Sequence, residues 1–214
     1  MTANTTASEL FTLLTDDEAV KWIIKQVEGP NAVARQIIDG FRKKARQHGV
    51  ADSVRMHAEA PFGCTFKHSI PWMGPCSKGF QYLQGWDFSD PQTEHSLLSW
   101  IPAPLIGSND KTVWEQNQLI EAFKAEAGLP AWYELSFGSA CHVGGLSFAH
   151  INATKKDPFA GMTVRTDTRH TDGGRLKLHW YRDCLGCDCF HFDVSRNPHL
   201  ANFVVGVVKA TDQH

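Results

Sequence analysis

"MTVRTDTRHTDGGRLKLHWYRD", residues 162 to 183, contains two strand signals separated by a turn signal. Both flanks are rich in threonine, aliphatic and aromatic residues, which are typical of β-strands. "HTDGG" between them supplies residues that favour a tight chain reversal. The stretch therefore predicts an antiparallel hairpin.

Other strand signals surround this hairpin. They are "WYELSFGSACHVGGLSFAHI" (132–151), "CDCFHFDV" (187–194) and "ANFVVGVVKA" (201–210). Strands that succeed one another without helices between them favour an antiparallel sheet over a doubly wound one.

Helix signals are concentrated earlier in the chain. Capping boxes, in which a Thr hydroxyl and a Glu carboxylate satisfy free main-chain amides, occur at "TDDE" (15–18) and "TVWE" (112–115). The second predicts a helix from Thr112 to Gly128 that turns Leu119, Ile120 and Phe123 inward. Residues 1 to 49 are predicted to be helical throughout.

Residues 50 to 111 contain six of the ten prolines, and long helices are therefore improbable there. "GFQYLQGWDF" (79–88) and "HSLLSWI" (95–101) are candidate short strands within an irregular, Pro- and Trp-rich middle. The predicted fold class is α+β, with a helical segment over 1–49 and an α+β domain over 50–214. The two ranges are compatible with one continuous domain.

Composition narrows the classes of partner. The 214 residues carry a formal net charge of -2, which gives no overall attraction to nucleic acid or to an anionic membrane. No stretch approaches the 18 or so apolar residues of a membrane span. The N-terminus lacks the basic region of a signal peptide, and six cysteines then indicate a reducing, cytoplasmic setting with free or metal-bound thiols.

"DCLGCDCFHFD" (183–193) is the most cysteine-rich stretch. A two-residue turn at Leu185-Gly186 would place four potential zinc ligands on one face of a hairpin, because side chains alternate along a strand. These ligands are Cys184, Cys187, Cys189 and His191. The leading hypothesis is therefore a binding or regulatory domain with a structural zinc ion. Buried apolar cysteines explain the same pattern without a metal.

A second hypothesis concerns thiol catalysis. "GPCSKGF" around Cys76 and "CHVGGLSFAHINA" from Cys141 resemble fragments of papain-like amidases, in which a cysteine opens a helix and a histidine opens a strand of the following sheet. That resemblance implies a hydrolase or amidase in which Cys76 is the nucleophile, His142 the base and Asn152 the residue that orients the base. The sequence leaves open whether the protein is an enzyme.

A third hypothesis rests on the basic residues of the helix predicted at 31–48, which follows another helix after a short turn and so resembles a helix-turn-helix. The candidate contacts to nucleic acid are Arg35, Arg42, Lys43 and Arg46. A solvated basic face is the commoner explanation of such a pattern, so nucleic acid is an unlikely partner.

Overall fold

The computed structural model describes residues 10–26, 31–73, 85–181, 184–188 and 193–210. Nine strands and five helices lie within these ranges. In chain order they are β1 (Thr12–Leu14), α1 (Asp16–Gln26), α2 (Asn31–Gln47), β2 (His57–Ala60), α3 (Phe66–Met73), β3 (Ser96–Trp100), α4 (Val113–Ala127), β4 (Glu134–Ser136), α5 (Ala140–Thr154), β5 (Thr163–Arg169), β6 (Arg175–Tyr181), β7 (Cys184–Asp188), β8 (Leu200–Asn202) and β9 (Val205–Lys209).

The larger sheet has five strands in the order β1-β2-β3-β9-β4, all antiparallel to their neighbours. Its central strand β3 is buried along its whole length. Leu97 faces one core and Leu98 the other, because side chains alternate across a strand. The sheet is therefore covered on both faces.

The smaller sheet has four strands in the order β7-β6-β5-β8. The β5–β6 and β6–β7 pairs are antiparallel, whereas β5 and β8 run parallel. The chain passes from β8 to β9, and so from the smaller sheet to the larger, through Phe203 and Val204 alone. Both residues are buried, so this crossing is part of the core.

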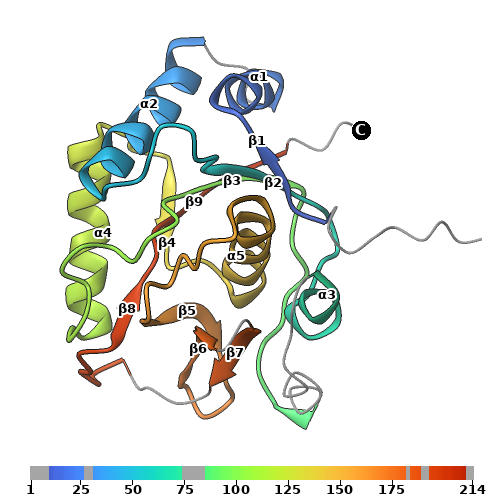
Figure 1. The fold of residues 1–214 in the computed structure, drawn as a ribbon, viewed down its shortest axis with the longest axis vertical. Coiled ribbons are helices and arrows are strands. Elements are labelled where there is room, and N and C mark those ends of the chain that lie inside the picture. The colour runs from blue at the N-terminus through green and yellow to red at the C-terminus, as the bar shows by residue number, and fades with distance from the viewer. Residues whose placement is uncertain (1–9, 27–30, 74–84, 182–183, 189–192, 211–214) are drawn as a thin grey trace, which may run out of the picture.

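The apolar residues form two cores on opposite sides of the larger sheet. One core joins the faces of α1, α2 and α4 to the sheet. The other joins the sheet to α3, α5 and the inner face of the smaller sheet. Figure 1 shows α5 in the centre of the molecule, between the strands β2 and β3 above it and the smaller sheet below it.

The structure confirms the α+β class and the elements with the clearest local signals. The hairpin between β5 and β6 pairs Arg169 with Arg175, and its turn is closed by a hydrogen bond from the His170 amide to the Gly174 carbonyl at 2.8 Å. The predicted helix at 112–128 is α4, and the "TDDE" box opens α1. The strand signal "HSLLSWI" is β3.

Two predicted elements are wrong. Residues 12–14 form strand β1 rather than helix, because they pair with β2. Within the strand signal at 132–151 only β4 is a strand, and Ala140 onward is helix α5. The strand signal at 201–210 is confirmed, but it is divided between two strands, β8 and β9. Of the candidate strand at 79–88, residues 79–84 lie outside the described ranges, and Phe88 forms an isolated bridge with His170.

No helix among the described residues combines the length and the hydropathy that crossing a bilayer would require.

Candidate functional site

Two cysteines that are 77 positions apart in the sequence meet at the start of α5. The Cys141 thiol donates a hydrogen bond to the Cys64 sulfur, with 3.4 Å between the two Sγ atoms. Both side chains are buried, with 3% of Cys64 and 2% of Cys141 exposed. Cys64 precedes α3 and Cys141 is the second residue of α5, so the pair joins two helices of the same core.

Hydrogen bonds with Thr93 hold the main chain of Cys64 in place. The Cys64 amide donates to the Thr93 hydroxyl at 3.0 Å, and the Thr93 amide donates to the Cys64 carbonyl at 2.8 Å. Thr93 is itself 4% exposed. Two hydrogen bonds to one buried residue leave the Cys64 backbone little freedom to move away from the helix.

The first turn of α5 fixes Cys141. Ser139 is the N-cap residue, and its hydroxyl accepts a hydrogen bond from the His142 amide at 3.1 Å. The Ala140 amide donates to the Thr168 hydroxyl of β5 at 2.9 Å. A helix N-terminus carries a partial positive charge, which favours a thiolate nearby. Cys141 belongs to this first turn, and the Cys64 sulfur lies 3.4 Å from its sulfur.

The two thiols differ in their tendency to ionise. The hydrogen bond from Cys141 lowers the pKa of Cys64 below its ordinary value, and the Ser69 hydroxyl acts in the same direction. The same hydrogen bond to Cys64, together with burial, raises the pKa of the Cys141 thiol. Cys64 is therefore the member that becomes a thiolate first, with Cys141 as a protonated partner beside it.

This arrangement is suited to forming a disulfide. A disulfide bond is about 2.05 Å long, so closing the gap requires a relative movement of the sulfurs of only about 1.4 Å. Rotation of the two side chains can supply much of that movement. Other thiols of the described residues, Cys184 and Cys187, lie in β7.

The predicted catalytic set is not assembled as the resemblance implied. Cys76 lies outside the described residues. His142 lies in α5 rather than in a strand, and burial lowers the pKa of its ring to about 4. Asn152 is an exposed residue ten positions later on the same helix, roughly 15 Å along the axis at 1.5 Å per residue. Asn152 therefore cannot orient the His142 ring.

The predicted turn of the cysteine-rich hairpin is wrong. Leu185 pairs with Trp180 inside the β6–β7 ladder, so the strands are connected at 182–183 rather than at Leu185-Gly186. Cys184 and Cys187 then lie three positions apart in one strand and point to opposite faces. Cys187 is 3% exposed and belongs to the core. The other two predicted ligands, Cys189 and His191, lie outside the described residues.

In the part of the chain that the structure describes, no three His, Cys, Asp or Glu side chains are grouped as a metal ion would need.

The basic residues predicted to contact nucleic acid are largely engaged within the protein. Arg42 forms an ion pair with Asp16 at 2.7 Å, and Arg46 forms one with Asp52 at 2.8 Å. Lys43 donates to a main-chain carbonyl of α4 at 2.9 Å. The fourth residue, Arg35, is exposed on α2. Three of the four charges therefore have acceptors within the fold.

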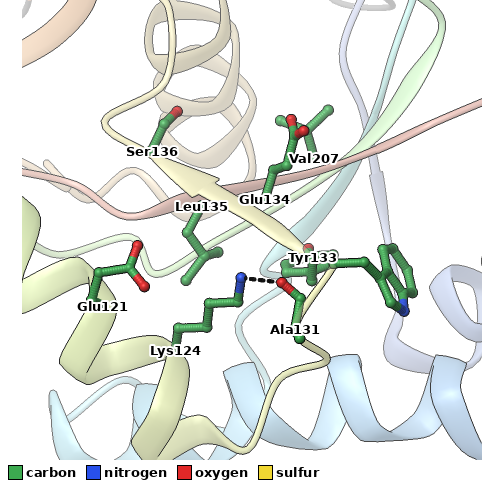
Figure 2. Close-up of a pocket in the computed structure, with 9 residues that line it drawn as sticks. Glu121, Lys124, Ala131, Tyr133, Glu134, Leu135, Ser136 and Val207 are labelled. Carbon is green, nitrogen blue, oxygen red and sulfur yellow. Dashed lines mark hydrogen bonds between the residues drawn. The ribbon is translucent and has the colours of Figure 1, made fainter.

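A groove of about 490 Å³ lies between α4 and the edge strand β4, and Figure 2 shows the side chains that line it. The Lys124 ammonium donates to the Ala131 carbonyl across its floor at 2.6 Å. Glu121 comes from α4 and Glu134 from β4, and Trp132 beside them is 52% exposed. The described residues that line this groove include no cysteine or histidine.

The Cys64–Cys141 pair has no signature in the sequence. Neither cysteine belongs to a C-x-x-C motif, and 77 positions separate them. The start of α5 did carry one local signal, because Ser139 immediately precedes an apolar run, as an N-cap residue does. Gly144 and Gly145, which follow in the same stretch, weaken this helix signal.

Searches for similar proteins do not assign this chain to a family: no protein-family model, curated protein or solved structure matches it.

Proposed function

We propose that this protein is a regulatory domain that responds to oxidation by forming a reversible disulfide between Cys64 and Cys141. The observation that carries the proposal is the 3.4 Å approach of two thiols from distant parts of the chain. The lowered pKa of Cys64 supports it, because thiolates rather than thiols react with oxidants.

The oxidant class that fits the site is a small hydroperoxide. Both sulfurs are buried, so the disulfide of a partner protein would not reach them without local opening. The Cys64 thiolate attacks one peroxide oxygen and becomes a sulfenic acid, while the other oxygen leaves as hydroxide or alkoxide and takes up a proton. The Cys141 sulfur then attacks the Cys64 sulfur and gives up its proton, and water leaves as the disulfide forms. Two thiols are oxidised and one peroxide is reduced.

The expected consequence is a covalent link between the start of α3 and the first turn of α5. These helices already pack in one core with both sheets. The link would fix their relative position, and its reduction by a dithiol would release them. This is the behaviour of a redox-controlled switch rather than of a permanent structural crosslink.

The test is peptide mapping after brief oxidation. Reduced protein is treated with stoichiometric hydrogen peroxide, its remaining thiols are blocked with N-ethylmaleimide, and the digest is analysed by mass spectrometry. We expect a linked pair of peptides containing Cys64 and Cys141, an intact mass that before blocking is lower by two hydrogen atoms, and full reversal by dithiothreitol.

Two variants sharpen the result. In Cys141→Ala the Cys64 sulfenic acid has no partner, so a sulfenic-acid probe such as dimedone should label Cys64. In Cys184→Ala the linked peptides should form as in the unmodified protein, because Cys184 lies in β7. Peroxide treatment that leaves Cys64 and Cys141 both free for alkylation would refute the proposal. The zinc content of the reduced sample is measured as well. It distinguishes thiols that do not react with peroxide from thiols that a bound metal ion protects.

A further inference from the structure

A second site lies at the opposite end of α5. A hollow of about 450 Å³ is enclosed by the end of β1, the segment that leads into β2, and the last turn of α5 with the residues that follow it. This volume lies in the range of pockets for small organic ligands. The hollow is distinct from the thiol pair, which lies at the first turn of the helix.

The charged side chains that line this hollow are both positive. They are Arg55 and Lys156, and the described residues that line it include no carboxylate. This bias does not follow from composition, because the chain has 23 acidic and 21 basic residues. Ion pairs elsewhere occupy nearby acids: Asp16 is bound to Arg42 and Asp52 to Arg46.

Both cations are available to a ligand. Arg55 uses one amino group to donate to the Leu13 carbonyl at 3.2 Å, which leaves other donors of its guanidinium. Neither Arg55 nor Lys156 forms an ion pair with any residue in the described ranges. Both side chains are exposed.

A buried imidazole also lines the hollow. His150 is 4% exposed, and its Nδ1 has no hydrogen-bond partner among the described residues. Burial lowers the pKa of this ring to about 4, with a further contribution from Lys156, so the ring is neutral at pH 7. The Nδ1 atom is itself buried, so the ring forms an uncharged part of the wall of the hollow.

The other residues that line the hollow indicate which class of anion it would bind. Leu13 and Val54 supply apolar wall, which suits a ligand with a hydrocarbon body. The C-terminal end of α5 brings a partial negative charge, which disfavours a doubly charged group more than a singly charged one. A monoanionic carboxylate fits these conditions better than a phosphate does.

We propose that this hollow binds a small organic carboxylate, with Arg55 and Lys156 on the carboxylate group and Leu13 and Val54 on the apolar body. His150 forms an uncharged part of the wall. The site is independent of the thiol pair, because it needs no oxidation.

The test uses octanoate as the probe and the fully reduced protein, so that failure of the redox proposal does not affect it. Isothermal titration calorimetry should detect octanoate binding. Arg55→Gln and Lys156→Gln should each weaken it about tenfold, because a charge-assisted hydrogen bond is lost in each. Lys155→Gln is the matched control: Lys155 is the neighbouring exposed lysine, it donates to the Asn152 carbonyl, and it does not line the hollow.

Two further ligands complete the test. Octanol has the same body without the charge and should not bind, and inorganic phosphate should not displace octanoate. Equal binding of octanol would overturn the role of the charges, and displacement by phosphate would overturn the choice of a carboxylate. Octanoate binding that is absent, or unchanged in both Arg55→Gln and Lys156→Gln, would overturn the site itself, as would an equal loss in Lys155→Gln.

Discussion

Two consecutive glycines lie in the middle of α5, where the helix has its closest neighbours. A Cβ atom at Gly145 would lie 2.4 Å from the Phe11 ring, and one at Gly144 would lie 3.2 Å from Ile70 and Phe66. Glycine is about 1 kcal/mol less favourable than alanine inside a helix. Here the missing side chain lets Phe11, which precedes β1, and α3 approach the helix closely, and tertiary packing outweighs the intrinsic preference.

At this scale we predict that Gly145→Ala destabilises the protein by about 1–3 kcal/mol, as overpacking of a filled core does. Urea unfolding followed by circular dichroism measures the change. Gly85→Ala is the control, because no other part of the chain that the structure describes has an atom within 4 Å of the position of its Cβ. Its effect should stay within about 0.5 kcal/mol. Stabilisation by Gly145→Ala would show that helix propensity dominates instead.

Among the elements, α4 has the most complete set of end signals. The Glu115 amide donates to the Thr112 hydroxyl at 3.3 Å, and the Thr112 amide donates back to the Glu115 carboxylate at 2.8 Å. These bonds with Thr112 lower the pKa of Glu115 to about 2. Gly128 ends the helix with a left-handed φ of 69°. Each end is therefore defined by residues within one turn of it.

For this element we expect Thr112→Ala to lower the free energy of unfolding by about 1 kcal/mol, the usual effect of removing an N-cap hydroxyl. Denaturant titration is again the measurement. Asn117→Ala, an exposed substitution within the same helix, should change stability by no more than about 0.5 kcal/mol. Equal stabilities for the two variants would mean that packing alone maintains α4.

At the scale of the whole molecule, three histidines in separate places have a lowered pKa for the same reason. His57 lies in β2, whereas His142 and His150 lie near the two ends of α5. Burial lowers the pKa of each ring from 6.5 to about 4. Unfolding exposes the rings, so between these pH values the unfolded chain binds more protons than the folded chain.

The free energy of unfolding should therefore fall as the pH is lowered from about 6.5 to about 4, and it should be steady above that window. Urea unfolding at a series of pH values measures the slope, which reports protons taken up on unfolding. His57→Gln should reduce the slope by up to one proton, while His199→Gln, at an exposed position, should leave it unchanged. A stability that is constant from pH 6.5 to 4 would contradict the burial of these rings.

The sequence by itself determined the parts of this protein whose causes are local. The capping boxes that open α1 and α4 span four residues each, and five residues connect β5 to β6. Hydrogen bonds between near neighbours set these features, so the pattern of residue types predicted them. These local features mark where helices begin and where strands reverse, so the α+β class could be predicted from them.

Only the tertiary structure decided the identity of α5 and the pairing of its cysteine. Gly144 and Gly145 weaken the helix signal, and their advantage comes from contacts with Phe11, which precedes β1, and with α3. Cys64 and Cys141 meet because the folded chain brings two helix starts together across 77 positions. In the same way, the ladder with β6 sets the register of β7, which places Leu185 and Cys187 in the core. Contacts between distant residues depend on the packing of the whole chain, and no local spacing encodes them.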